Sequence, residues 1–322
     1  MIETFNLLTK EIKEHDNIVI MAHKGMDLDA YGSSLCLYEI IKSFEKNVMI
    51  YMNKEIENKS IEKSLTAINE SNINIKYVYK KEDIPIINTL AVVLDTHKAS
   101  LLEDYDAIRG LEIFIIDHHI TNVETIESKY TYINHEVSST VEILVNYAKY
   151  LNRELSPIVA TIMLAGLEVD TNSFDVKTTD KTYEAAAYLV KSGADNIMKK
   201  QLLKEDKENY CKRQDFVKSS TMLTENISLC VMDNNIYKKY MLALISEDLL
   251  QFDKVEASFT IGYVEDDTVG ISARSIGNID VEDIMSKLGG GGHKTDAATI
   301  IKNTTIDEVK EKFITVIKEV NK

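Results

Sequence analysis

The 322-residue sequence predicts an α/β protein of two domains, and three observations support this fold class. Short apolar runs alternate with helical patterns in the first half, as they do in a parallel sheet covered by helices. A charged helical segment then interrupts the pattern, and strand-like runs with turn residues return after it. We therefore predict a parallel-sheet domain with flanking helices in residues 1–194, a helical linker in 195–225, and a smaller α/β domain with a mixed sheet in 226–322.

The first domain is predicted to contain strands that are buried on both faces, because their sequences are apolar throughout. These strands are Ile18–Ala22, Val48–Met52, Ile75–Tyr79, Ala91–Leu94 and Ile113–Ile116. The predicted helices are Ala30–Phe44, Thr140–Leu151, Pro157–Glu168 and Thr182–Lys191. Ser139 and Glu142 have the spacing of a capping box before the second helix. Ser156 and Pro157 start the third helix, and Gly193 ends the fourth.

The second domain begins with four predicted strands. They are Ile227–Met232, Tyr240–Ile245, Ala257–Val264 and Val269–Ser275. Asp266 and Asp267 form the turn of a hairpin between the last two strands. A short helix over Val281–Leu288 precedes a run of four glycines and His293. A final helix starts near Ile306, with Thr305 and Glu308 as its cap.

Composition and charge exclude several classes of protein. A formal net charge of −15 argues against a protein that coats long nucleic acids. No apolar run approaches the ~20 residues that span a bilayer, and the polar N-terminal segment is no signal peptide. Three widely separated cysteines indicate reduced thiols. We expect a soluble, cytoplasmic chain without membrane contact.

Acidic and histidine side chains follow the predicted apolar elements in four separate motifs. Those with the character of metal ligands are His23, Asp27, Asp29, Asp95, His118 and Asp170. The carboxyl ends of parallel strands meet at one edge of a sheet, so these side chains are expected to converge. Clustered carboxylates repel one another unless cations lie between them. Oxygen-rich ligands with two imidazoles and no thiolate favour Mn²⁺, with Mg²⁺ or Co²⁺ as alternatives.

The spacing of the first motif allows one loop to reach two ions. His23 and Asp27 can hold one ion and Asp29 the other, while Asp95 and Asp170 are candidates to bridge both. Two ions about 3.5–4 Å apart activate water for attack on phosphorus. Replacing either bridging residue by alanine is expected to abolish turnover with little unfolding, because like-charge repulsion is relieved.

His119 follows a ligand and is a candidate to contact a phosphoryl oxygen or protonate a leaving group. Ser139 is either only a helix cap or also a phosphate contact at a helix N-terminus. His15, His97 and His135 are interpreted as solvated or structural residues. Lys24 and Lys98 are either phosphate contacts or residues outside the phosphate site, and we favour the second interpretation.

The glycine run of the second domain is a candidate anion-binding loop. Ordering four glycines has a large entropic cost, and a simple turn needs only one or two. The backbone N–H groups of Gly290, Gly291 and Gly292 could bind an anion, with His293 and Arg274 as further donors. The alternatives are a flexible hinge for the glycines and an ordinary strand position for Arg274.

The motifs resemble the DHH phosphoesterase superfamily with its DHH-associated C-terminal domain. The resemblance covers essentially the whole chain and is carried by MAHKGMDLDAYGSSL, VVLDTHKASLL, FIIDHHITN, VSSTVEIL, AGLEVDTNSF and SARSIGNIDVEDIMSKLGGGGHKTDAAT. The chain looks most like the catalytic portion of the membrane-anchored cyclic-di-AMP phosphodiesterases. Met26 departs from the family pattern, which has proline before the first aspartate. The transmembrane, sensory and cyclase-like domains of those enzymes have no counterpart here, so we expect either a stand-alone relative or an excised catalytic fragment.

The resemblance implies roles for individual residues. One Mn²⁺ would bind His23, Asp27, Asp95 and Asp170, and the other Asp29, Asp95, His118 and Asp170. His119 would face the substrate phosphate, and Asp117 would support the histidines. Arg274 and Gly289–His293 would hold the far nucleotide across an interdomain cleft. Family members are frequently homodimers, so a homodimer is expected.

The function expected from this resemblance is hydrolysis of cyclic-di-AMP to the linear dinucleotide, with onward cleavage to AMP left open. The alternative is a nano-RNA hydrolase that also removes phosphate from 3′-phosphoadenosine 5′-phosphate. Both would act on small nucleotides, and the metal site does not distinguish them. A non-catalytic nucleotide sensor is a third possibility, while a processive exonuclease or an inorganic pyrophosphatase is less favoured.

Overall fold

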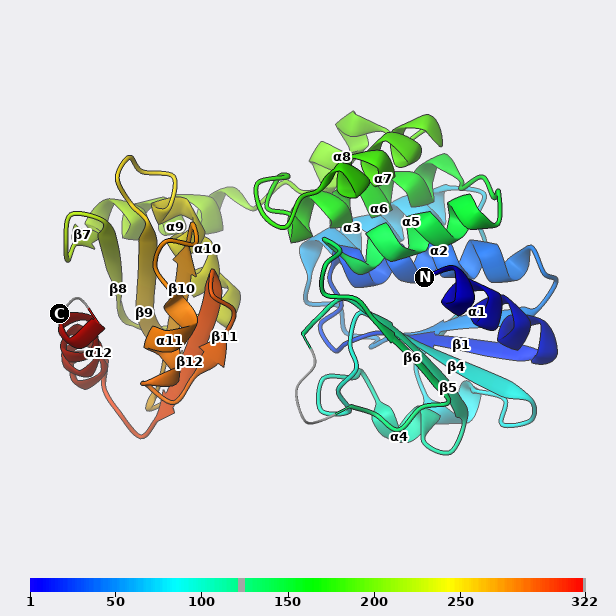
Figure 1. Ribbon diagram of the computed structural model, residues 1–322, viewed down its shortest axis with the longest axis horizontal. Coiled ribbons are helices and arrows are strands. Elements are labelled where there is room, and N and C mark those ends of the chain that lie inside the picture. Colours follow the sequence, from blue (N-terminus) through cyan, green and yellow to red (C-terminus); the bar gives the residue numbers. More distant parts are fainter. Residues whose placement is uncertain (121–124, 321–322) are drawn as a thin grey trace. The chain divides into compact units, whose positions relative to one another are not determined.

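The computed structural model describes residues 1–120 and 125–320, which form two compact units, Met1–Lys204 and Glu205–Lys322 (Figure 1). Each unit has its own hydrophobic core. The segment predicted as one linker helix instead forms two helices, α8 (Asn196–Leu202) and α9 (Lys207–Ser219). The boundary between the units falls between these helices, so each unit contains one of them.

The first unit is built on a six-stranded parallel sheet with the order β3-β2-β1-β4-β5-β6. Its strands are β1 (Asn17–Met21), β2 (Asn47–Tyr51), β3 (Tyr77–Val78), β4 (Thr89–Leu94), β5 (Glu112–Asp117) and β6 (Tyr130–Ile133). The five predicted strands are present, although β3 is shorter than predicted. Strand β6 was not predicted, because it is a half-exposed edge strand without a continuous apolar run. The strand order reverses between β1 and β4, which is where ligands bind in open α/β sheets.

Helices cover both faces of this sheet, with α2, α5 and α6 on one face and α4 on the other (Figure 1). The α-helices are α1 (Ile2–Glu14), α2 (Leu28–Lys42), α3 (Lys59–Glu70), α4 (Tyr105–Ile108), α5 (Thr140–Tyr150), α6 (Pro157–Asp170) and α7 (Asp180–Lys191). A 3₁₀ turn, η1 (Lys81–Asp83), precedes β4. Among the helices of residues 1–120 and 125–320, none has the length and apolar character needed to cross a membrane.

Helices α2 and α6 pack against each other at close range, because glycine lies at their contact. A Cβ atom on Gly166 would lie 2.5 Å from the Leu28 carbonyl oxygen and 2.9 Å from the Asp29 Cα. Gly166 stands one turn before Asp170, the last residue of α6. The close packing therefore brings the end of α6 to the beginning of α2.

The second unit contains a mixed six-stranded sheet with the order β11-β12-β10-β9-β8-β7. Its strands are β7 (Thr221–Met222), β8 (Ile227–Ile236), β9 (Ala257–Glu265), β10 (Thr268–Ser275), β11 (Gly291–Gly292) and β12 (Asp296–Lys302). Strands β8 and β9 are parallel, and the other pairs are antiparallel. Strand β12 was not predicted, because the apolar and polar residues of its sequence, DAATIIK, do not alternate.

Three further helices complete the second unit, namely α10 (Lys239–Leu249), α11 (Val281–Ser286) and α12 (Ile306–Val320). The prediction of a strand at Tyr240–Ile245 was wrong, because this segment lies within α10. Met241, Leu242, Ile245 and Leu249 are buried and share the core-facing side of this helix. A short apolar run fits a buried strand or a buried helix equally well, and here tertiary packing selects the helix.

Candidate metal centre

The four sequence motifs meet at the carboxyl edge of the parallel sheet. His23 follows β1, Asp95 follows β4, and the Asp117–His119 run closes β5. Strands β1, β4 and β5 are neighbours in the sheet, so their ends lie side by side. Asp27 is the N-cap of α2, where its carboxylate accepts a hydrogen bond from the Ala30 backbone N–H at 3.0 Å. The predicted convergence of strand ends is thus present in the structure.

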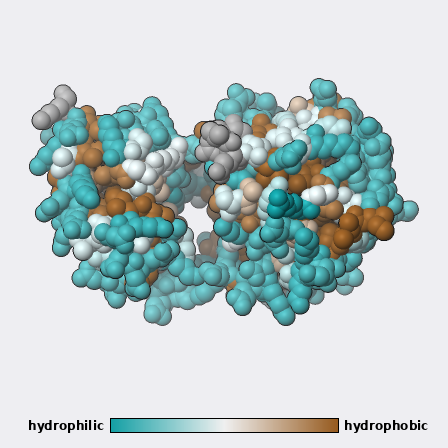
Figure 2. Space-filling view, turned by 90° about the horizontal axis from the view of Figure 1, so that it is seen from below, coloured by the Kyte–Doolittle hydropathy of each residue, from teal (hydrophilic) through white to brown (hydrophobic). Residues whose placement is uncertain are grey.

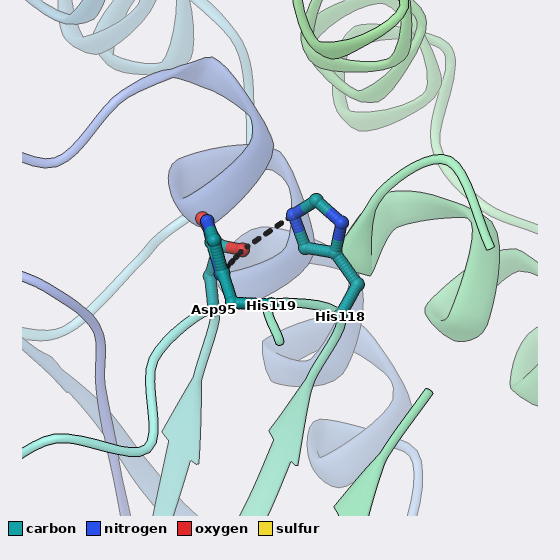
Figure 3. Close-up of side chains that lie close together, drawn as sticks. All are labelled: Asp95, His118 and His119. Carbon is teal, nitrogen blue, oxygen red and sulfur yellow. Dashed lines mark ion pairs between the residues drawn. The ribbon is translucent and has the colours of Figure 1, made fainter. Parts of the chain in front are cut away.

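The His118 imidazole lies at the centre of one group of carboxylates. Its Nε2 atom is 3.3 Å from Asp95 Oδ1, 3.3 Å from Asp170 Oδ2 and 3.9 Å from Asp29 Oδ2. Figure 3 shows His118 and His119 on the loop after β5, with both rings next to Asp95. This arrangement collects ligand atoms from β4, β5, α2 and α6.

The His23 imidazole is the centre of a second group. Its Nε2 atom is 3.5 Å from Asp95 Oδ2 and 3.7 Å from Asp27 Oδ2. His23, Asp27 and Asp95 form one cluster of potential ligand atoms, and Asp29, His118 and Asp170 form another. Asp95 Oδ2 faces the His23 imidazole, and Asp95 Oδ1 faces those of His118 and, at 3.7 Å, His119. The structure therefore brings all six predicted ligand residues together, with Asp95 between the two clusters.

Helix α5 holds the Asp29 carboxylate in place. The Thr140 and Val141 backbone N–H groups donate to Asp29 at 2.8 Å and 2.7 Å. These groups belong to the N-terminus of a helix, where the dipole and the unpaired N–H groups favour an anion. The anion bound at this helix N-terminus is therefore the protein's own carboxylate.

Ser139, which we considered as a phosphate contact, is buried and caps α5 by accepting from the Glu142 N–H at 3.1 Å. The rest of the predicted capping box differs. The Glu142 carboxylate accepts from the Ser138 hydroxyl at 2.6 Å and from the Thr182 hydroxyl at 2.8 Å. Glu142 thus links α5 to α7 instead of returning to the Ser139 backbone.

The electrostatics of the centre indicate that a cation fits it. Burial and the neighbouring Asp170 and Asp95 carboxylates raise the pKa of Asp29. Burial and the Asp27 and Asp95 charges raise the pKa of Asp170 to about 6. Carboxylates with raised pKa values are destabilised by their own proximity, and a bound cation would relieve this.

For the two histidines, burial acts on the pKa in the opposite direction, because it disfavours the protonated, charged imidazole. Burial alone would lower the pKa of His118, but the neighbouring Asp170 and Asp95 carboxylates outweigh it and raise that pKa. In the same way, Asp27 and Asp95 raise the pKa of His23 to about 11 against the effect of burial. Neither buried ring nitrogen of His118 meets hydrogen-bond geometry with a partner in the described part of the chain. A buried imidazole without a hydrogen-bond partner, together with the carboxylates beside it, offers the ligand atoms that a metal ion requires.

The backbone at Asp95 is unusual. Its φ angle is 60°, in the left-handed region that non-glycine residues seldom adopt. The Asp95 N–H donates to the Ile116 carbonyl at 3.0 Å, and the Thr140 hydroxyl donates to Asp95 Oδ1 at 2.9 Å. Such strained backbone occurs where the surrounding structure fixes a functional side chain.

Asp117 is a buried hub for two histidines. Its Oδ1 atom accepts from the backbone N–H groups of His118 (2.7 Å) and His119 (3.1 Å) and faces His119 Nδ1 at 2.8 Å. Its Oδ2 atom lies 2.5 Å from Nδ1 of His97. Despite burial, the hydrogen bonds from His119 and His97 lower the pKa of Asp117. His97 is almost fully buried, so of the two interpretations that the sequence left open, solvated or structural, burial excludes the first.

Sequence reasoning missed the link between His97 and the DHH run. The one available signal was its position two residues after Asp95, in a motif that follows a buried strand. Histidine in such a loop is more often exposed than buried, and only the pairing of β4 with β5 places it on Asp117.

A pocket of about 290 Å³ opens beside this centre. Its lining includes carboxylates and imidazoles of the centre and two lysines, and the residues are His23, Lys24, Asp27, Asp95, Thr96, His97, Lys98, Leu101, Asp117, His119 and Asp170. The pocket therefore joins the candidate ligands to His119 and to basic groups.

A separate acidic cluster lies near the opposite end of the sheet and has a simpler explanation. Glu11, His15 and Glu112 have ligand atoms close together. The Lys129 ammonium donates to Glu11 at 3.0 Å and to Glu112 at 2.8 Å. An amino group thus already supplies the positive charge there.

In the second unit, Arg274 is held by two acidic residues. Its Nε donates to Glu247 at 3.2 Å and its Nη1 to Asp296 at 2.5 Å. Arg274 and Asp296 line a mostly apolar pocket of about 310 Å³ between α10, β10 and β12. Figure 2 shows a brown, hydrophobic region on this unit between hydrophilic surfaces.

The glycine run has packing reasons for most of its members. Gly289 has a φ of 81° after α11, and the Gly290 N–H donates to the Met285 carbonyl at 2.8 Å. A Cβ on Gly290 would lie 2.2 Å from the Ala298 carbonyl oxygen, and Gly292 has a φ of 152°. A Cβ at Gly289 or Gly291 would have open space, but only Gly291 also lacks a positive φ. The run turns from α11 into the edge strand β11, and His293 follows it in a tight turn with Asp296.

Comparison with protein families gives two matches. Residues 17–167 match the N-terminal domain of the DHH family, and residues 226–322 match the DHHA1 domain. The cyclic-di-AMP phosphodiesterase of Geobacillus thermodenitrificans is 33% identical over 95% of this chain and 48% of its own length. The chain spans about half the length of the curated relatives of this type.

Two further matches cover both chains more fully. The bifunctional oligoribonuclease and PAP phosphatase of Mycoplasma genitalium is 25% identical over 91% of this chain and 91% of its own. The crystal structure of an exopolyphosphatase-related protein from Bacteroides fragilis has a TM-score of 0.82 at 20% identity, covering 99% of this chain and 98% of the other. That structural match supports the fold.

Proposed function

Because the chain belongs to the DHH family, we propose that it is a metal-dependent phosphodiesterase that hydrolyses cyclic-di-AMP to the linear dinucleotide. The observation that carries the proposal is the convergence of six potential ligands on one centre, four of which line the pocket beside it, with Asp95 facing both imidazole centres. The cyclic-di-AMP phosphodiesterases with 31–33% identity over almost the whole chain favour this substrate.

Two divalent ions, with Mn²⁺ preferred, fit the donor set of oxygens and imidazoles. His23 and Asp27 would hold one ion, Asp29 and His118 the other, and Asp95 and Asp170 would be shared. Bound at this centre, the ions supply an activated water and neutralise charge on the phosphate. Protein residues do the rest: α5 fixes Asp29, and Asp117 fixes the neighbouring histidines.

His119 is the proposed contact to the reacting phosphate. Its ring is half exposed at the pocket, while its Nδ1 is held by Asp117 at 2.8 Å. A ring held at Nδ1 directs Nε2 away from the carboxylate, where it can donate to a phosphoryl oxygen or to the leaving oxygen. In the second unit, Arg274, Gly290, Gly291, Gly292 and His293 are proposed to bind the distant nucleotide.

The discriminating experiment is a substrate panel with Mn²⁺. Cyclic-di-AMP, cyclic-di-GMP, a linear dinucleotide, short RNA and 3′-phosphoadenosine 5′-phosphate are incubated with purified protein and analysed by chromatography. The proposal expects the linear dinucleotide from cyclic-di-AMP at the highest rate. If cyclic-di-AMP is left intact while short RNA is cleaved, the proposed substrate is wrong.

The oligoribonuclease and PAP phosphatase remains the second candidate, because the relative from Mycoplasma genitalium matches over nearly the full length of both chains. The metal centre would perform the same attack on either substrate. Cleavage of short RNA and release of phosphate from phosphoadenosine phosphate would favour this candidate. Tight binding of nucleotide without turnover of any panel member, with metal supplied, would instead favour a sensor.

A further inference from the structure

The pocket beside the candidate metal centre contains a lysine whose charge is not used within the protein. Lys24 and Lys98 both line it. The Lys24 ammonium donates to the Ser100 carbonyl at 2.7 Å, so it is held at the pocket rim. In residues 1–120 and 125–320, the Lys98 side chain has neither a hydrogen bond nor an ion pair. Its ammonium is therefore available to a ligand.

The backbone that carries Lys98 is fixed on both sides. The Lys98 carbonyl accepts from the N–H groups of Leu101 at 3.1 Å and Leu102 at 3.2 Å. The Lys24 N–H donates to the Leu101 carbonyl at 2.8 Å, which ties this loop to the first motif. The preceding residue, His97, is anchored on Asp117. These contacts fix the Lys98 backbone beside the pocket, and the side chain extends from this fixed point.

The negative charge of the other pocket residues indicates what a lysine would do at this position. Four carboxylates line the pocket, those of Asp27, Asp95, Asp117 and Asp170. A phosphate at the metal centre would be neutralised by the bound cations. A second phosphate of the same substrate would instead meet carboxylates and be repelled, unless a cation lies on the pocket wall.

We propose that Lys98 binds the second phosphate of a substrate that carries two, and that it thereby favours dinucleotides over diesters with a single phosphate. The inference rests on the proposed function, because it requires the phosphate under attack to lie at the metal centre. A lysine–phosphate contact at a partly buried site is a charged hydrogen bond, so its removal is expected to cost about tenfold in affinity.

The first test measures binding and does not depend on turnover. A phosphorothioate analogue of cyclic-di-AMP is titrated by calorimetry into the Mn²⁺-loaded wild type, Lys98→Ala and Lys98→Arg, at low and high salt. We expect Lys98→Ala to weaken binding about tenfold and to lose part of the salt dependence, while Lys98→Arg restores both. Lys42→Ala, on the last turn of α2 and outside the pocket, removes the same charge and should leave binding as in the wild type.

The second test compares two substrates. For Lys98→Ala, kcat/KM should fall about ten times more for cyclic-di-AMP than for bis(p-nitrophenyl) phosphate, which has one phosphate. Equal losses on both substrates would overturn the proposal, and so would unchanged binding of the analogue. If wild-type protein binds the analogue and cleaves only the single-phosphate diester, the proposed function fails, while the calorimetric comparison still decides the role of Lys98.

Discussion

The carboxylates of the centre are not equivalent, although each lies among like charges. Asp29 and Asp170 have raised pKa values, because burial and neighbouring carboxylates disfavour their charge. Asp95 is just as buried, but the neighbouring His118 and His23 imidazoles lower its pKa. The sequence argument expected relief of repulsion on removing either Asp95 or Asp170. The Asp95 charge does raise the pKa of both Asp29 and Asp170, but its two imidazole neighbours oppose that relief. We therefore expect the Asp95 charge to stabilise the metal-free fold and the Asp170 charge to destabilise it.

Asp170→Asn is predicted to abolish turnover while stabilising the chelator-treated protein. Above pH 6 the ionised carboxylate is unfavourable, so its removal should raise the free energy of unfolding by about 1–3 kcal/mol. Asp95→Asn should also abolish turnover but lower stability, because His118 and His23 lose their shared partner. Denaturant unfolding in chelator measures the sign for each variant. Changes of the same sign would contradict the assigned electrostatics.

His97→Ala is predicted to impair both stability and catalysis. Removing a buried partner of the Asp117 carboxylate should cost about 2–4 kcal/mol. Turnover of a simple diester should fall as well, because Asp117 also orients His119. His97→Asn keeps a donor toward Asp117 and should recover part of both. The exposed His135→Ala is the control, and an effect as small as this control would show that His97 does not position the hub.

At the scale of elements, glycines decide which segments approach one another. Gly166 allows α6 to contact the beginning of α2, which places Asp170 beside Asp29. In the second unit, Gly290 lies against β12, while Gly291 next to it has free space. Close backbone packing therefore accounts for part of a glycine run that the sequence argument assigned to ligand approach, with a flexible hinge as the alternative.

The glycine run supplies a matched pair of variants for stability. Gly290→Ala should destabilise the second unit by about 1–3 kcal/mol or more, because its Cβ would meet backbone atoms of β12. Gly291→Ala, one residue later, should change the free energy of unfolding by less than about 1 kcal/mol. Urea titration followed by circular dichroism gives both values. Similar losses for both variants would mean that the loop needs glycine for its conformation at each position.

At the scale of the whole molecule, stability should depend on pH and on metal together. In metal-free protein the pKa values of Asp29, Asp170, His23 and His118 are all raised. A group with a raised pKa binds more protons in the folded than in the unfolded state, so its contribution to stability falls as pH rises. The aspartates begin to lose this contribution near pH 4, and Asp170 loses it as the pH passes through about 6. The histidines begin to lose it near pH 6.5.

The melting temperature of chelator-treated protein is therefore predicted to fall between pH 5 and pH 8. Mn²⁺ replaces the protons, so the increase in melting temperature that it gives should be larger at pH 8 than at pH 5. Asp95 and Asp117, whose pKa values are lowered, titrate below this range. Differential scanning fluorimetry with chelator or Mn²⁺ at both pH values makes the measurement. A metal effect that is independent of pH would argue against the ligands assigned here.

The sequence by itself determined the α/β class, the strands β1 to β5 and the six residues that converge. Buried parallel strands have continuous apolar sequences, and a polar group directly after such a strand has one edge of the sheet to occupy. Three features depended on tertiary structure, namely helix α10, the strands β6 and β12, and the link between His97 and Asp117. Short apolar runs fit helix or strand alike, neither β6 nor β12 has a continuous apolar run or a strict alternation, and contacts between neighbouring strands join residues that are distant in sequence. The unequal pKa values of Asp95 and Asp170 were likewise set by which imidazoles the fold places beside each carboxylate.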